Sequence, residues 1–112
     1  MTRSPLTEAA FQRQVIDLAH LFGWLVQHTR PARTSKGWRT PIAGDPGSPD
    51  LTLAKGGLLL IPELKVGNNQ PSPQQRRWLE ALAAVREVRS CVWRPGNWDE
   101  IEAILRGGRN SR

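Results

Sequence analysis

Two acidic residues and a lysine are brought together by a hairpin that the sequence predicts. Two apolar runs flank Gly56–Gly57, a glycine pair that is typical of a two-residue turn between antiparallel strands. If the turn is centred there, Asp50 lies opposite Glu63, and directly opposed residues have Cβ atoms about 4.5–5.5 Å apart on one face of a sheet. Lys65 follows Glu63 by two residues, so it shares that face.

The chemistry expected of this group is metal-assisted hydrolysis of a phosphodiester. Two carboxylates at this distance repel each other, and the apolar strands around them favour burial, so one carboxyl would tend to take up a proton. A divalent cation removes the conflict, because carboxylate oxygens, a backbone carbonyl and several waters suit octahedral Mg²⁺. Such a metal polarises a phosphoryl oxygen and lowers the pKa of an attacking water. Lys65 can orient that water or offset charge at phosphorus.

Plainer interpretations remain open from the residues alone. Glu63 and Lys65 can form an ordinary surface ion pair, worth about 0–1 kcal/mol, with Asp50 only closing a turn after Pro49. Pro62 raises a further question, because proline has no N–H group and prefers an edge strand or a bulge. A bulge would shift the register and separate Asp50 from Glu63.

The elements that position these residues follow from periodicity and turn signals. Helices are predicted where apolar residues recur at helical spacing after a capping residue: after Thr7 or Ser4 up to Gly23, after Ser72 with Pro73 in first position, and after Asn97 through Leu105. Strands are predicted at Trp24–His28, Asp50–Ala54, Leu58–Lys65 and Val88–Arg94. This order predicts an α/β fold with a four-stranded mixed sheet, flanking helices and a C-terminal helix.

Three tryptophans fall on apolar stripes of these predicted elements, and we expect them in the core: Trp24, Trp78 and Trp93. The single cysteine, Cys91, is predicted to be a small buried hydrophobic residue. One cysteine also excludes an internal disulfide framework and a multi-cysteine zinc site.

Basic residues gather in one predicted loop, residues 29–48, which is rich in Pro, Thr, Ser and Gly. The chain has 16 Lys plus Arg against 10 Asp plus Glu, a formal net charge of +6, although a GC-rich genome that favours arginine codons explains the total equally well. No acid lies between Asp17 and Asp45. The predicted nucleic-acid-binding residues in this span are Arg30, Arg33, Lys36, Trp38 and Arg39. The alternative is a solvated loop whose Trp38 packs on the core.

The length of 112 residues predicts a single domain, 1–112, with flexible tails at 1–6 and 106–112. No apolar run approaches the roughly 20 residues that span a bilayer, and the N-terminus has no apolar signal core. We therefore expect no membrane association and a cytoplasmic location.

Several of these residues together resemble the PD-(D/E)XK nuclease signature. Gly47–Asp50, followed by Glu63–Lys65, is similar to its Pro-Asp and Glu-x-Lys motifs. Other segments resemble the VRR-NUC branch of that superfamily: Glu8, Phe11–Gln12, Gly23–Trp24, Ser72–Leu79 and Val92–Pro95. The resemblance covers about residues 7–105. Each short motif is weak by itself, and the order of all of them carries the match.

The resemblance implies a restriction-endonuclease-like αβββαβ core and metal-dependent phosphodiester hydrolysis with Mg²⁺ or Mn²⁺. The residues that it implies are Asp50, Glu63 and the Leu64 carbonyl as metal ligands, with Lys65, Gln75 and Glu8 as further catalytic residues. Pro62 departs from the usual aliphatic or small residue before the Glu-x-Lys motif. Short stand-alone members are typically phage-type proteins, so the resemblance also implies a homodimer that cleaves Holliday junctions or other branched DNA in replication, recombination or repair. It likewise implies that the cytoplasm is that of a bacterium or a phage-infected host cell.

Two other functions remain open. A nucleic-acid-binding module without catalysis would use the loop around residues 30–39, and its binding would depend steeply on salt but not on a divalent metal. A subunit that scaffolds a phage complex would capture a protein partner tightly and DNA weakly. The set of Asp50, Glu63 and Lys65 weighs against the binding module, because a pure binder gains nothing from two acids that face phosphate.

Overall fold

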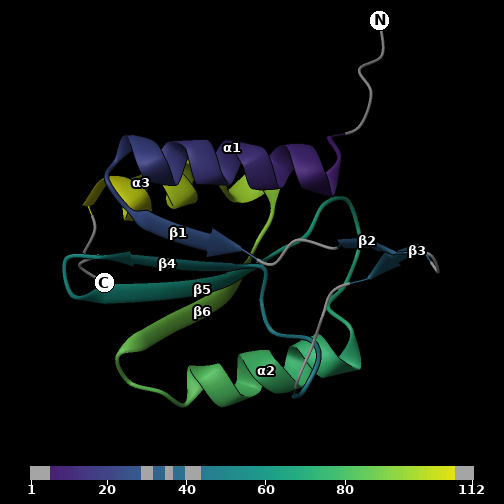
Figure 1. Cartoon of the computed structure of the whole chain (residues 1–112). Coiled ribbons are helices and arrows are strands. Elements are labelled where there is room, and N and C mark those ends of the chain that lie inside the picture. The colour runs from purple at the N-terminus through teal and green to yellow at the C-terminus, as the bar shows by residue number, and fades with distance from the viewer. Residues whose placement is uncertain (1–5, 29–31, 35–36, 40–43, 108–112) are drawn as a thin grey trace, which may run out of the picture.

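The computed structural model describes residues 6–28, 32–34, 37–39 and 44–107. Helices α1 (Glu8–Leu21) and α3 (Trp98–Gly107) cover one face of a four-stranded sheet, and α2 (Pro73–Ala83) lies on the other face (Figure 1). The predicted α/β class is confirmed, with its mixed sheet, flanking helices and C-terminal helix. None of the helices in these ranges combines the length and the hydropathy that a membrane crossing requires.

The main sheet has the strand order β1-β4-β5-β6. Its strands are β1 (Leu25–His28), β4 (Leu51–Lys55), β5 (Leu58–Leu64) and β6 (Val88–Trp93). Strands β1, β4 and β5 pair antiparallel, whereas β6 runs parallel to β5. The parallel pairing arises because α2 carries the chain back to the end of the sheet where β5 begins. Each predicted strand is confirmed to within one residue at either end.

The hairpin between β4 and β5 has the predicted register. Lys55 lies opposite Leu58, and Leu53 lies opposite Leu60. The two residues of the turn, Gly56–Gly57, have φ angles of 59° and 82°. A type I′ turn requires positive φ at both central positions, which glycine adopts without steric cost. This turn sets the register that points Asp50 toward Glu63.

Pro62 lies inside β5, with neither the bulge nor the edge position that its missing N–H favours. The register of β5 with β6 continues through it without interruption. The Lys65 N–H donates to the Trp93 carbonyl of β6 at 3.0 Å, and alternate N–H groups of a strand face opposite neighbours. The nitrogen of Pro62 therefore faces β4, where the paired residues extend only as far as Leu53 and Leu60. The ladder with β4 thus stops where proline cannot donate.

The core fills the face of the sheet that α1 and α3 cover. Its buried apolar side chains are Phe11, Val15, Ala19, Trp24, Leu51, Leu53, Leu60, Leu64, Trp93, Ile101, Ile104 and Leu105. Each large side chain buried in this way stabilises the fold by about 1.5–3 kcal/mol. The predicted core positions of Trp24 and Trp93 are confirmed. That of Trp78 is wrong, because no residue of α2 is fully buried and this helix covers its face of the sheet only in part.

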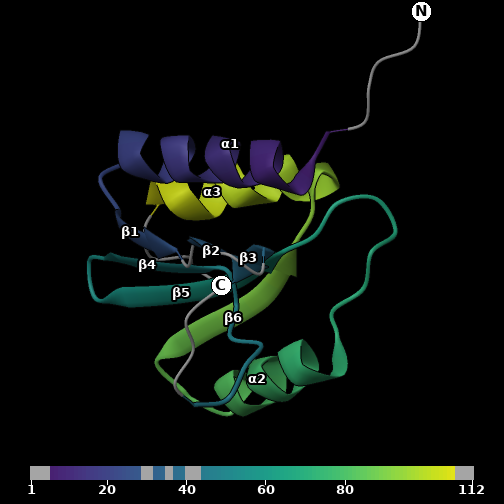
Figure 2. The same cartoon turned by 45° about the vertical axis from the view of Figure 1, so that its right-hand side comes forward.

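The prediction of a continuous loop over residues 29–48 is also wrong in part. Strands β2 (Ala32–Thr34) and β3 (Gly37–Arg39) pair antiparallel and form a separate two-stranded sheet. Figures 1 and 2 show this small hairpin apart from the helices that cover the main sheet. Strands of three residues are too short to produce an alternating pattern that can be recognised in a sequence.

The C-terminal helix begins directly after a 3₁₀ turn, Pro95–Asn97. The Asn97 side chain, predicted to cap the helix, accepts a hydrogen bond from the Arg94 backbone N–H at 2.9 Å. Helix α3 includes Arg106, which the sequence pattern assigned to the tail. The Arg106 guanidinium lies 5.0 Å from the centre of the Phe22 ring, and this contact ties the end of α3 to the end of α1.

The segment that leads into Asp50 rests against α2. Gly47 has a φ of 98°, and a Cβ atom built there would lie 2.7 Å from the backbone carbonyl carbon of Gln74. The Trp78 indole N–H donates to the carbonyls of Asp45 at 3.3 Å and Pro46 at 3.1 Å. Only glycine fits this approach, so the position of α2 and that of the Asp50 segment depend on each other.

We expect Gly47→Ala to lower the free energy of unfolding by about 2–4 kcal/mol, because a methyl group adds both backbone strain and a clash with α2. Gly67→Ala is the matched control: its φ is 58°, but nothing lies within 4 Å of the added Cβ. The control should lose only about 1 kcal/mol. Urea unfolding followed by tryptophan fluorescence measures both, and equal losses would contradict the close approach.

Candidate functional site

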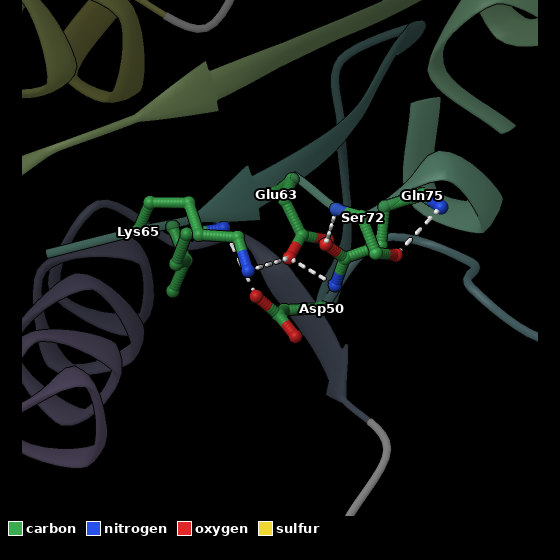
Figure 3. Close-up of polar contacts among 6 residues, drawn as sticks. Asp50, Glu63, Lys65, Ser72 and Gln75 are labelled. Carbon is green, nitrogen blue, oxygen red and sulfur yellow. Dashed lines mark hydrogen bonds and ion pairs between the residues drawn. The ribbon is translucent and has the colours of Figure 1, made fainter. Parts of the chain in front are cut away.

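The predicted site residues converge where β5 ends and the chain enters β4. Asp50 precedes β4, Glu63 and Leu64 are the last residues of β5, and Lys65 follows them. The Asp50 carboxylate accepts a hydrogen bond from the Leu64 backbone N–H at 2.9 Å through Oδ2. The two carboxylates and the Lys65 ammonium point toward one another, as Figure 3 shows. The separation of Asp50 from Glu63 that a bulge would cause does not occur.

Glu63 is the most deeply buried of these groups, with 0% of its surface exposed. Its Oε2 lies 2.8 Å from the Gln75 side-chain nitrogen and 3.6 Å from the Lys65 ammonium. Its Oε1 is buried and has no hydrogen-bond partner among the residues that the structure describes. The ion pair of Glu63 and Lys65 therefore exists, but it is not the surface pair that remained open from sequence. Burying an oxygen without a partner costs free energy.

The electrostatics of the site follow from this burial. Desolvation and, second, the negative charge of Asp50 raise the pKa of Glu63 to about 8, although the nearby Lys65 ammonium acts in the opposite direction. Glu8, in the first turn of α1, lies close enough to respond as well: partial burial and then the charge of Asp50 raise its pKa. The structure thus brings Glu8 into electrostatic range of the other predicted site residues.

Gln75 presents its amide to Glu63 in a fixed orientation, because two hydrogen bonds with Ser72 hold its backbone and its side chain. The Gln75 Oε1 accepts a hydrogen bond from the Ser72 backbone N–H at 2.8 Å, and the Ser72 hydroxyl accepts one from the Gln75 backbone N–H at 3.2 Å. This reciprocal pair is the capping box that begins α2. With the amide oxygen occupied, the amide NH₂ must be the group that faces Glu63 (Figure 3).

The donor set fits a hard divalent cation that keeps part of its hydration shell. The buried Glu63 Oε1 has a free acceptor position, and the Asp50 carboxylate lies beside it. The Leu64 N–H faces Asp50, and since the N–H and C=O of one strand residue face the same neighbour, the Leu64 carbonyl faces that side too. No group of three or more His, Cys, Asp or Glu side chains gathers as a cage within the described ranges. Mg²⁺ needs no such cage, because it is commonly held by one or two carboxylates plus waters.

The predicted nucleic-acid-binding residues are only partly described. The backbones of Arg33 and Trp38 lie opposite each other in the β2–β3 hairpin, and Arg39 is in β3 as well. Arg30 and Lys36 lie outside the described residues. The proposed contacts of all five with DNA remain predictions.

Sequence reasoning missed the part that Ser72 plays in the site. Ser72 was predicted as a helix cap, but not as the group that orients the amide of Gln75. The signal was present, because Ser72 and Gln75 have the spacing of a capping box, Ser-x-x-Gln. The indole N–H of Trp78 was missed too, since an apolar stripe gives no hint of a polar contact with the segment before Asp50.

Comparison with known proteins adds no relative, since no family model and no curated protein matches the sequence.

Glu63→Gln should stabilise the metal-free protein at neutral pH. The native state keeps a proton on Glu63 between pH 4.5 and about 8, where the unfolded state has lost it, so wild-type stability falls as the pH rises through this window. The glutamine variant lacks this fall. Its advantage should be absent below pH 4.5 and then widen by up to about 1.4 kcal/mol per pH unit. Urea unfolding in EDTA at several pH values tests this, and parallel pH profiles would refute it.

Gln75→Ala should lower the free energy of unfolding by about 1–2 kcal/mol, because it removes half of the capping box and the hydrogen bond to Glu63 together. Gln74→Ala changes the neighbouring exposed residue and should cost less than about 0.5 kcal/mol. Thermal unfolding followed by circular dichroism compares the two. A Gln75 variant as stable as the Gln74 variant would show that the capping box contributes little.

Proposed function

We propose that this protein is a metal-dependent DNA endonuclease. The observation that carries the proposal is the fully buried Glu63 carboxyl, whose Oε1 has no partner among the described residues while Asp50 and Lys65 stand beside it. Such an arrangement lowers stability unless a cation completes it. Unfavourable polar groups of this kind concentrate at functional sites.

The residues of the chain have separate parts in this proposal. Asp50, Glu63 and the Leu64 carbonyl would hold the metal, and Mg²⁺ or Mn²⁺ supplies a polarised phosphoryl oxygen and a more acidic water when bound. The Leu64 N–H fixes Asp50, and the Gln75 amide fixes one oxygen of Glu63 so that the other stays available. The Lys65 ammonium is placed to orient the attacking water and to offset negative charge that develops at phosphorus.

The choice of DNA, and of branched DNA, rests on charge and on the resemblance to the VRR-NUC branch of PD-(D/E)XK nucleases. The net charge of +6 favours a polyanionic partner. If the small β2–β3 hairpin is set aside, the order of helices and strands agrees with the αβββαβ core that the resemblance implies. We further propose that the protein has this nuclease core, forms a homodimer and acts in the cytoplasm. Its proposed substrate is a Holliday junction or a related branched DNA.

Cleavage of labelled four-way junction, flap, single-stranded and linear duplex DNA tests the proposal. We expect hydrolysis with Mg²⁺ or Mn²⁺ and none in EDTA. Asp50→Asn, Glu63→Gln and Lys65→Met should each slow it by about 10²–10³-fold, because each removes a metal ligand or a charge that acts on the transition state. Gln74→Ala, on the exposed side of α2, is the matched control and should cleave like the wild type.

Binding of the metal alone gives a second measurement. Mg²⁺ should raise the melting temperature of the wild type, because a ligand that binds only the native state stabilises it, and it should not raise that of Asp50→Asn. Cleavage that survives Glu63→Gln would refute the proposal. Salt-sensitive DNA binding in EDTA without cleavage of any substrate would instead identify a binding module.

A further inference from the structure

A groove adjoins the carboxylates on the face of the sheet that α2 covers. It has a volume of about 220 Å³. Its lining includes Gln27, Asp50, Thr52, Ile61, Trp78 and Leu82, which come from β1, the start of β4, β5 and α2. The groove and the carboxylate site therefore share Asp50 as a common wall.

The groove exists because this face is incompletely covered. Side chains alternate along a strand, and Leu51, Leu53 and Leu60 fill the core on the opposite face. Thr52 and Ile61 consequently point toward α2. Helix α2 lies on this face, opposite α1 and α3 (Figure 2). None of its residues is fully buried, and Trp78 and Leu82 of this helix line the groove.

The two sides of the groove differ in chemistry. Ile61, Trp78 and Leu82 provide apolar surface, whereas Gln27 and Thr52, which lie opposite each other on β1 and β4, provide an amide and a hydroxyl. The N–H of Trp78 is already bonded to the Asp45 and Pro46 carbonyls, so its indole contributes ring surface only. A flat ring with polar edges matches this lining.

Size and charge narrow the ligand further. The volume lies below the roughly 300–1,000 Å³ of drug-sized ligand sites, so it accommodates one ring system. Asp50 is an acid, and the lining residues that the structure describes include one histidine, His28, but neither Lys nor Arg. A phosphate inside the groove would find no lysine or arginine to pair with, whereas a neutral base needs no such partner.

We infer that this groove receives the unstacked base of a nucleotide that flanks the phosphodiester to be cut. The inference rests on the proposed endonuclease function, because a phosphate beside Asp50 would place its neighbouring base at the groove. It also gives a reason for a preference for branched DNA. Bases at a junction or an end leave the stack at lower cost than bases inside a duplex.

The first test uses the wild-type protein and a substrate whose cleavage position has been mapped. An abasic residue replaces, one at a time, each nucleotide near the cut. We expect one flanking position to raise KM by about tenfold, the range for loss of one stacked base, while the other positions leave it unchanged. A uniform response at all positions would overturn the inference.

A pair of variants tests the location. Thr52→Phe fills the groove, whereas Ala54→Phe puts the same side chain on the same strand face, two residues farther along, outside the lining. Thr52→Phe should raise KM by about tenfold, keep kcat, and lose the sensitivity to the abasic residue. Ala54→Phe should behave like the wild type. Equal KM values in the two variants would overturn the inference. If Thr52→Phe does not fold, Thr52→Val replaces it: this variant removes the hydroxyl but leaves the groove open, so it should raise KM by a smaller factor and keep the sensitivity to the abasic residue, and a KM equal to that of Ala54→Phe would overturn the inference.

The outcomes separate this inference from the proposed function. If DNA is cleaved but no position shows a specific abasic effect, the proposed endonuclease function is supported and base binding in the groove is refuted. If no DNA is cleaved, titration with thymidine at millimolar concentration still tests the groove through the ¹H–¹⁵N signal of the Trp78 indole. A shift of that signal in the Ala54→Phe protein, but not in Thr52→Phe, supports base binding, and no shift in either protein overturns it.

Discussion

A carboxyl group buried beside a second acid is the arrangement that the rest of the site accommodates. Glu63 has no exposed surface, and Asp50 adds a like charge at short range. Three contacts stabilise the two carboxylates. Gln75 of α2 donates to one oxygen of Glu63, the Lys65 ammonium balances its charge, and the backbone of β5 donates to Asp50. The buried Oε1 of Glu63 receives no such contact from the part of the chain that the structure describes. The hairpin, the helix and the segment between them are therefore all constrained by a group that lowers stability by itself.

Helix α2 illustrates how polar contacts can position an element that buries little. None of its residues is fully buried, in contrast to α1 and α3, which share a continuous apolar core with the sheet. Its place is defined instead by the capping box at Ser72, the amide of Gln75, the indole N–H of Trp78 and the close approach of Gly47. These contacts are directional, so they fix the helix in orientation even though they contribute little hydrophobic stabilisation.

Local signals in the sequence predicted the fold well. Gly56–Gly57 and the alternation around it gave the register of the hairpin, which in turn predicted the approach of Asp50 to Glu63. The burial of Glu63 was expected from the apolar strands around it and is confirmed, but its completeness could not be predicted, because it depends on where α2 docks on the sheet. The same long-range fact decides that Trp78 lies outside the core. Strands β2 and β3 were not predicted, because a strand of three residues is too short to show periodicity.

Two prolines on facing strands have a shared effect that neither has alone. If the hairpin register is continued toward the site, Pro49 lies opposite Leu64, and Pro62 lies opposite Leu51. A proline has no N–H group to donate to the carbonyl of the residue opposite it. The carbonyls of Leu64 and Leu51 therefore accept no hydrogen bond from Pro49 or Pro62. Pro62, which by itself is unfavourable inside β5, thus belongs to a pair of prolines with the same effect. Together the two interrupt the ladder at the Leu64 carbonyl, which is the backbone oxygen of the proposed metal site.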